Sequence, residues 1–329
     1  MKPFRYERGT DVSGAVAAIA AAPNGAFLAG GTNLVDHMRL GIATPDLLVD
    51  VRRLTSDRIE ELPDGGVRIG AAVTNSELAA DRLIRRRYPM LSEALLSGAS
   101  GQLRNVATVG GNLLQRTRCV YFQDLTTPCN KREPGSGCSA REGYQRDAAI
   151  LGASQACVAT HASDMAVAMA ALDAVVHAQG PNGARKIPVT ELHRLPDDRP
   201  ERDTVLEHGE LITAIDLPAL AVAANSRYRK VRDRASYAFA LVSVAAALDV
   251  ADGFVRDVPL ALGGVSHKPW RALKAEATLR GKPATELACL NAADAELAAA
   301  RALPGNAFKV RLARNAIVRT LLDLVELPR

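Results

Sequence analysis

Residues 29–34 read Ala29-Gly30-Gly31-Thr32-Asn33-Leu34, directly after the apolar run Ala26-Phe27-Leu28. A second segment of the same character reads Thr108-Val109-Gly110-Gly111-Asn112-Leu113. Paired glycines after a strand can adopt positive φ, expose successive N–H groups and leave room for a diphosphate. Neither segment has the spacing of a Rossmann or P-loop motif. Both segments therefore indicate an anion-binding turn outside those two classes, although a Gly-Gly pair alone also fits an ordinary turn.

The residues around these turns predict a chain of mixed α+β type. Residues 67–70 are typical of a strand, and Thr74 to Glu77 has the spacing of a capping box at a helix start. Residues 165–172 predict a helix that begins after Ser163. Residues 218–226 are a candidate domain boundary, and a long helix over 307–325 is expected to end the chain. By contrast, residues 97–162 show little periodicity until Ala148, which is typical of a functional or disordered loop.

Composition excludes several classes of protein. The chain has 329 residues and a formal net charge of +5, with both signs interspersed, so we expect no nucleic-acid partner. The N-terminus lacks the apolar region of a secretory signal, and no apolar run approaches the roughly 20 residues of a membrane span. Five cysteines in a chain without a signal argue against a disulfide framework.

Four of the five cysteines, Cys119, Cys129, Cys138 and Cys157, lie in the irregular segment. Four thiolates around one centre suit either zinc or an iron–sulfur cluster. The wide spacing lacks the close cysteine pairs of structural zinc sites, which favours a cluster. Nearby cations are expected to offset its negative charge, namely Arg116, Arg118, Lys131, Arg132 and Arg141. Reduced, incidental cysteines are the alternative, and Cys289 is interpreted as a buried small hydrophobe.

Six motifs follow one another along the chain. They are Ala29-Gly30-Gly31-Thr32-Asn33-Leu34, Gly70-Ala71-Ala72-Val73-Thr74, Thr108-Val109-Gly110-Gly111-Asn112-Leu113, Ser163-Asp164-Met165, Tyr228-Arg229-Lys230-Val231-Arg232 and Ala261-Leu262-Gly263-Gly264-Val265. Together they resemble the FAD-binding medium subunits of the xanthine dehydrogenase family of molybdenum hydroxylases, over essentially the whole chain. The cysteine segment is similar to that of the FAD subunits of bacterial periplasmic aldehyde oxidoreductases, where the insert binds a [4Fe–4S] cluster.

The resemblance implies a vanillyl-alcohol-oxidase-type (PCMH-type) FAD-binding domain over 1–220, with a [4Fe–4S] insert at about 114–160. A smaller α+β domain would follow over 221–329. Cys119, Cys129, Cys138 and Cys157 would bind the cluster. The implied FAD-binding residues are Ala26, Phe27, Leu28, Ala29, Gly30, Gly31, Thr32, Asn33, Leu34, Thr108, Gly111, Asn112, Asp164, Ile215 and Lys230.

Asp164 and Lys230 have specific implied roles at the flavin. Asp164 would contact the flavin region, and it also suits the start of a helix. A cation at Lys230 near the flavin N1–C2 edge would stabilise the anionic reduced ring. Ile215 would contribute backbone near the adenine half.

The leading hypothesis is an electron-transfer subunit of a heterotrimeric aldehyde oxidoreductase. Electrons would pass from a large molybdenum-cofactor subunit, through a small [2Fe–2S] subunit, to FAD here and then to an external acceptor. No residue of this chain would be catalytic toward the aldehyde. A stand-alone flavin oxidase and a zinc-stapled binding module are the alternatives. The chain would be periplasmic if co-exported with a signal-bearing partner, and otherwise cytoplasmic.

Overall fold

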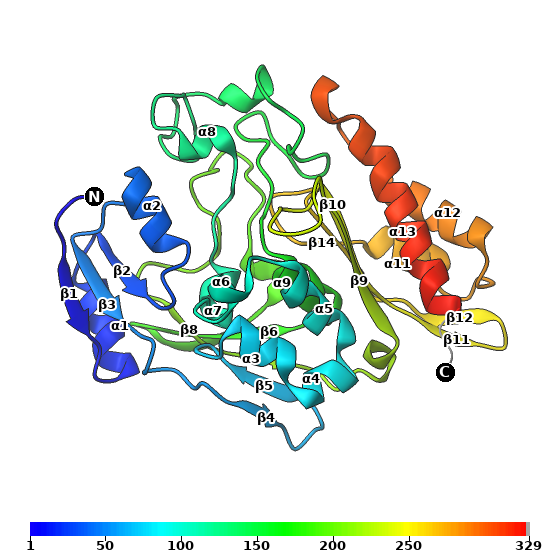
Figure 1. Ribbon diagram of the computed structural model, residues 1–329, viewed down its shortest axis with the longest axis horizontal. Coiled ribbons are helices and arrows are strands. Elements are labelled where there is room, and N and C mark those ends of the chain that lie inside the picture. The colour runs from blue at the N-terminus through cyan, green and yellow to red at the C-terminus, as the bar shows by residue number, and fades with distance from the viewer. Residues whose placement is uncertain (327–329) are drawn as a thin grey trace.

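The computed structural model describes residues 1–326 and begins with a small parallel sheet (Figure 1). Strand β3 (Leu47–Asp50) lies between β1 (Arg5–Arg8) and β2 (Gly25–Leu28) and is parallel to both. Helix α1 (Val12–Ala20) buries Val16 and Ile19 against this sheet, and Asp11 caps its N-terminus. Helix α2 (Leu34–Leu40) starts directly after the glycine turn that follows β2. The predicted strand before the first glycine segment is confirmed, and the helix after it was not predicted.

A five-stranded antiparallel sheet forms the next layer, in the order β4-β5-β8-β6-β7. Helices α3, α5, α7 and α9 pack over its core, and the expected capping box forms between Thr74 and Glu77 at the start of α3. The strands are β4 (Ile59–Glu61), β5 (Val67–Gly70), β6 (Val175–Gly180), β7 (Gly183–Pro188) and β8 (Leu211–Leu217). The helices are α3 (Asn75–Ala80), α4 (Arg82–Arg87), α5 (Pro89–Ser97), α6 (Gly101–Arg104), α7 (Val109–Leu113), α9 (Asp164–Ala171) and α10 (Val189–Leu192).

Between α7 and α9 the chain is almost free of regular structure, as the lack of periodicity predicted, whereas α6 and α7 lie in the first part of the stretch 97–162, where no helix was expected. Residues 114–162 contain only α8 (Val120–Gln123) and the 3₁₀ turn η1 (Ser139–Arg141) among the described elements. Figure 1 shows this segment, with α8, at one end of the molecule. We call residues 114–162 the cysteine segment.

The C-terminal part is built on a second antiparallel sheet, in the order β14-β13-β10-β9. All six residues of β10 are buried, because α9 covers one side of this strand and α13 the other. The strands are β9 (Ser226–Val231), β10 (Val242–Ala247), β11 (Asp249–Ala251), β12 (Phe254–Asp257), β13 (Leu260–Gly263) and β14 (Trp270–Arg271). The helical elements are η2 (Ala221–Ala224), α11 (Leu273–Leu279), α12 (Glu286–Leu297), η3 (Pro304–Asn306) and α13 (Phe308–Glu326).

The start of α13 is anchored by a buried lysine. The Lys309 side chain is fully buried and donates hydrogen bonds to the carbonyl oxygens of Ala148, at 2.9 Å, and Gly264, at 2.5 Å. Burial lowers the pKa of Lys309 to about 8. One ammonium group therefore joins the C-terminal helix to the end of the cysteine segment and to a turn of the second sheet.

The lowered pKa of Lys309 predicts how stability changes with pH. Between about pH 8 and about 10.5, the unfolded chain keeps a proton that the folded chain has lost. The free energy of unfolding should therefore rise through this interval, by on the order of 2 kcal/mol. Lys309→Met should remove this rise, as measured by chemical denaturation at about pH 7 and about pH 9.5. An equal rise in the free energy of unfolding in the wild type and in Lys309→Met would contradict the prediction.

Candidate functional site

Two adjoining cavities lie at the predicted glycine turns. The first, of about 270 Å³, is lined by Thr108, Gly111 and eight residues of the segment 26–34, all except Leu28. We call it the glycine-loop cavity. The second, of about 380 Å³, is lined by Asn112, Asp164 and Lys230, and we call it the Asp164 cavity. The two share Thr32, Asn33 and Gly111, so they can hold different parts of one elongated ligand.

The two glycine segments touch each other through their backbones. A Cβ atom on Gly30 would lie 2.1 Å from the carbonyl oxygen of Val106, so only glycine fits there. Gly31 has a φ of +72°, which also favours glycine. On the other segment, Gly110 N–H donates to Ala71 O at 3.0 Å, and Thr108 caps α7 by accepting from Gly111 N–H. The sequence therefore fixes a tight backbone contact between turns about 80 residues apart.

A buried ion pair lies in the Asp164 cavity. Lys230 Nζ donates to Asp164 Oδ2 at 2.8 Å and to the carbonyl oxygen of Ser97 at 3.0 Å. Tyr228 Oη donates to the other carboxylate oxygen at 2.6 Å. Burial, together with the Asp164 charge, raises the pKa of Tyr228 well above its usual range. Sequence reasoning named Lys230 as an isolated cation, whereas in the structure its charge is offset by Asp164.

Two predicted site residues, Leu28 and Ile215, line neither cavity. The Ile215 side chain is fully buried in the core, where it pairs across the sheet with Ile69 and Val176, and its predicted backbone contribution stays a prediction. Leu211 and Ile212 line the glycine-loop cavity from the same strand. A register shift between β6 and β8 at this point changes which β8 residues face the cavity. A bulge of this kind leaves no sign in the sequence of β8 itself.

The structure brings all four cysteines of the cysteine segment together. Cys119, Cys129, Cys138 and Cys157 line one small cavity of about 10 Å³, and none of them forms a disulfide. The Cys157 thiol donates toward Cys138, which lowers the pKa of Cys138 to about 6 and raises that of Cys157. Burial raises the pKa of Cys119. Within residues 1–326, no three His, Cys, Asp or Glu side chains are arranged to hold a single metal ion.

The basic residues of this segment have other partners than the predicted cluster. Arg118 pairs with Asp36 at 3.1 Å. Arg132 donates to three carbonyl oxygens of residues 121, 122 and 127, and Arg141 donates to Ser154 O. These contacts brace the backbone of the segment or join it to other parts of the fold. Arg132 and Arg141 keep their positive charge in them, because carbonyl oxygens are neutral, so the offset of cluster charge stays a prediction.

Asp203 links the cysteine segment to the first glycine turn. It accepts from Lys131 Nζ at 2.5 Å and from Arg116 Nε at 2.5 Å. The backbone N–H of Arg116 in turn donates to Asn33 Oδ1 at 3.0 Å. Burial of Asp203 opposes ionisation, but the charges of Arg116 and Lys131 lower its pKa to about 2. Sequence reasoning missed Asp203, because nothing near it in the chain marks it as a partner.

Three histidines, also missed from the sequence, lie beside this link; His193 and His267 are buried and His161 is partly exposed. His161, His193 and His267 line one small cavity together with Lys131 and Asp203. The ring centroids of His161 and His193 are 4.3 Å apart. Burial lowers the pKa of His193 to about 4 and that of His267 to about 3, and it lowers the pKa of His161 well below its usual value. All three imidazoles are therefore neutral at pH 7.

Two protein-family models match this chain and together cover most of it. The FAD binding domain in molybdopterin dehydrogenase matches residues 2–220, and the CO dehydrogenase flavoprotein C-terminal domain matches residues 226–324. The chain belongs to the FAD-binding subunits of the molybdopterin dehydrogenases. The predicted fold class, a PCMH-type FAD-binding domain followed by an α+β domain, is thereby confirmed.

Individual relatives agree with this assignment. The chain is 50% identical over 325 residues, 98% of both chains, to the aldehyde oxidoreductase FAD-binding subunit PaoB of Escherichia coli (strain K12). It is 26% identical to the glyceraldehyde dehydrogenase medium chain of Sulfolobus acidocaldarius, over 85% of this chain and 82% of that one. Among solved structures, carbon monoxide dehydrogenase from Hydrogenophaga pseudoflava has a TM-score of 0.75 at 27% identity, covering 98% and 97% of the two chains. The predicted oxidoreductase subunit is thus confirmed.

The two adjoining cavities fit FAD chemically. The contact of Gly30 with Val106 leaves backbone, not side chain, at the edge of the glycine-loop cavity, as close approach of a diphosphate requires. The Asp164 cavity contains buried polar atoms, Asn75 Oδ1 and Arg118 Nε, that have no hydrogen-bond partner among residues 1–326. A flavin ring carries both donor and acceptor groups that could pair with them.

The contact between the glycine turns predicts a specific loss of FAD. Gly30→Ala should lower FAD affinity at least tenfold, because the new methyl group would push the Val106 backbone out of place. Gly101→Ala is the matched control, since a Cβ there meets nothing within 4 Å. Flavin absorbance per chain after reconstitution and desalting measures the effect. Full flavin retention by Gly30→Ala would show that the contact does not shape the site.

Proposed function

We propose that this chain is the FAD-binding, electron-transfer subunit of a heterotrimeric molybdenum-dependent aldehyde oxidoreductase. The single observation that carries the proposal is the 50% identity, over 98% of both chains, to an aldehyde oxidoreductase FAD-binding subunit. The partners would be a large molybdenum-cofactor subunit and a small [2Fe–2S] subunit. The chain itself would consist of an FAD domain over 1–220 and a C-terminal domain over 221–329. It would be periplasmic if one of its partners carries an export signal, and otherwise cytoplasmic. Among residues 1–326, no helix is both long and apolar enough to cross a membrane.

In this proposal the glycine-loop cavity holds the adenosine diphosphate half of FAD, against residues 26–34, Thr108 and Gly111. The flavin ring lies in the Asp164 cavity, beside Asn112, Asp164 and Lys230. FAD, when bound, supplies a two-electron redox centre that can also exchange single electrons with iron–sulfur centres. The Asp164–Lys230 pair orients the ring and keeps its surroundings electrically neutral. The apolar side chains of Ala94, Leu95 and Leu103 exclude water from one wall.

We also propose that Cys119, Cys129, Cys138 and Cys157 bind a [4Fe–4S] cluster. The supporting observation is that these thiols, although up to 38 residues apart, line one common cavity. Each thiolate of a four-iron cluster binds its own iron, so the sulfurs stand farther apart than around one zinc. Neither family model describes a cluster, so this part rests on the cysteines of this chain.

The function is tested by isolating the native complex through a tag on this chain. We expect stoichiometric FAD on the tagged chain, with molybdenum and iron in co-purifying subunits. The complex, but not the isolated chain, should oxidise aromatic aldehydes with an artificial acceptor. Metal analysis, flavin extraction and an aldehyde assay provide the measurements. A purified chain that holds no FAD after reconstitution would refute the proposal, and aldehyde turnover by that chain alone would favour a stand-alone oxidase.

Cys129→Ser tests the cluster. With one ligand removed, iron should fall from about four per chain to nearly none, and the broad visible absorbance should disappear. The subunit should also become less stable, because the cluster joins distant parts of the cysteine segment. Cys289→Ser is the matched control, since Cys289 is buried in the C-terminal core far from this cavity. Unchanged iron in Cys129→Ser, or one zinc per wild-type chain, would refute the assignment.

A further inference from the structure

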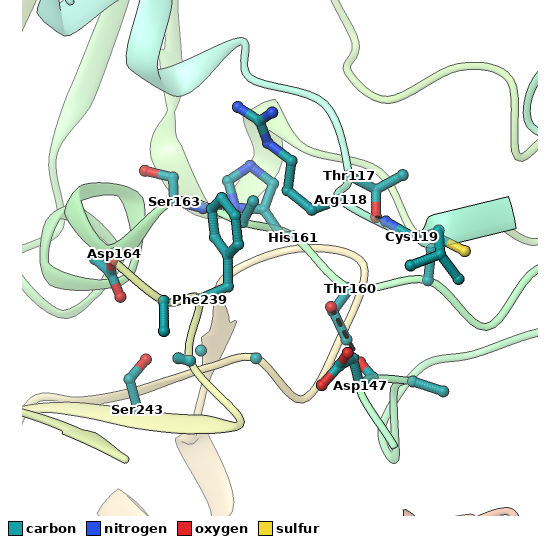
Figure 2. A pocket seen from close by; sticks show the side chains of 18 of the residues that line it. Thr117, Arg118, Cys119, Asp147, Thr160, His161, Ser163, Asp164, Phe239 and Ser243 are labelled. Carbon is teal, nitrogen blue, oxygen red and sulfur yellow. Dashed lines mark hydrogen bonds between the residues drawn. The ribbon is translucent and has the colours of Figure 1, made fainter. Parts of the chain in front are cut away.

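A stretch of four residues, 116–119, borders both proposed cofactor sites. We call the small cavity lined by the four clustered cysteines the cysteine cavity. Cys119 lines the cysteine cavity, Arg118 lines the Asp164 cavity, and Arg116 lines the glycine-loop cavity. Figure 2 shows Thr117, Arg118 and Cys119, with the Cys119 N–H donating to Thr117 Oγ1 at 3.2 Å. A displacement of Cys119 would therefore be felt at once by residues that line the FAD cavities.

Asp203 holds this stretch from a distant part of the chain. Its Oδ2 accepts from Arg116 Nε, and its Oδ1 accepts from Lys131 Nζ. Lys131 lines the cysteine cavity, and its side chain is only 2% exposed. Arg116 also holds the first glycine turn, because its backbone N–H donates to Asn33 Oδ1 at 3.0 Å. One carboxylate thus lies between a cation of the cysteine cavity and a residue that positions the glycine turn.

Phe122 fills the space between the same two cavities. It is fully buried and lines the cysteine cavity. Its ring centroid lies 4.7 Å from the guanidinium carbon of Arg116 and 5.6 Å from the centroid of the His37 ring. Arg116 and His37 both line the glycine-loop cavity. Because a close-packed interior transmits strain, a shift of Phe122 would displace both of these lining residues.

We propose that Asp203 is a positioning residue that couples the two cofactor sites, so that assembly of the cluster strengthens the binding of FAD. The inference rests on the proposed function. A cluster would fix four thiols that otherwise lie on irregular backbone, and it would fix Lys131 with them. Asp203 would then hold Arg116, and through it Asn33, in the arrangement that receives FAD. By linkage, bound FAD would strengthen retention of the cluster by the same factor.

A carboxylate is suited to this role because both of its oxygens accept hydrogen bonds, and in Asp203 each oxygen serves one cation. The amide of Asn has almost the same shape but only one acceptor oxygen. Asp203→Asn can therefore keep Lys131 or Arg116 as a partner, but not both. The substitution should break the connection between the two sites while it leaves each set of cofactor-binding residues in place.

The test compares the FAD affinity of the full chain with its cluster and after anaerobic removal of iron by a chelator. In the wild type, FAD should bind about tenfold more tightly when the cluster is present. In Asp203→Asn, the ratio of the two affinities should fall to about one. A merely structural role of Asp203 would weaken both affinities alike and leave their ratio unchanged. Quenching of flavin fluorescence measures the affinity, and iron analysis confirms the state of the cluster.

Arg116→Met is a second variant, needed if Asp203→Asn does not fold. It breaks the same connection but leaves Lys131 and Asp203 paired with each other, so the buried ammonium group keeps its partner. Loss of a group that lines the glycine-loop cavity should weaken FAD binding with and without the cluster. The ratio of the two affinities should nevertheless fall to about one, as in Asp203→Asn.

Asp216→Asn is the matched control. Asp216 also accepts from two side chains, Arg68 and His177, but it lines none of the three cavities, so this variant should keep the wild-type ratio. Equal FAD affinities of the wild type with and without its cluster would refute only the coupling. A wild-type ratio in Asp203→Asn and Arg116→Met, or a ratio of one in Asp216→Asn, would also refute it. A wild-type chain that binds no FAD would refute the proposed function itself.

Discussion

The ion pairs of Asp203 are the interaction on which the rest of the site depends. One carboxylate accepts from Lys131 in the cysteine segment and from Arg116 beside the second glycine turn, and Arg116 in turn holds Asn33 of the first. The Lys131 side chain is only 2% exposed. Removal of one partner from a buried pair costs about 3–5 kcal/mol, because it leaves a charge without compensation. Together with the Arg118–Asp36 pair and the Lys309 hydrogen bond to Ala148, this link fixes about 49 residues of irregular backbone against the cofactor cavities.

Local patterns in the sequence predicted the elements well, because local chemistry determines them. The Gly30-Gly31 turn, the Thr74–Glu77 capping box and the final helix depend on backbone conformation, a side-chain cap and apolar periodicity. The convergence of the four cysteines was also predictable, since a dense group of cysteines in a Gly- and Pro-rich loop has few other uses. In each case the residues that determine the feature lie within one segment of the chain.

What the sequence could not predict depends on contacts between distant segments. Asp203 meets Lys131 and Arg116 from 72 and 87 residues away, and the three clustered histidines are scattered from 161 to 267. From the sequence alone, the Asp203 carboxylate is equally consistent with an exposed surface charge. The environment of Ile215 was also not predictable, because one bulge between β6 and β8 decides which residues of the strand face the cavity. Strand pairing and register are properties of the assembled sheet and cannot be recognised in the sequence of a single strand.

The buried Asp164–Lys230 pair shows how a neighbouring charge changes the electrostatic effect of a residue. As an isolated cation, Lys230 would act on a flavin ring through net charge. As half of a buried pair it acts through a dipole, whose effect depends on which end faces the ring. Asp164 and Lys230 both line the Asp164 cavity, so a ring bound there meets both ends of the pair. The pair therefore orients the ring by its dipole and adds little net charge to the cavity.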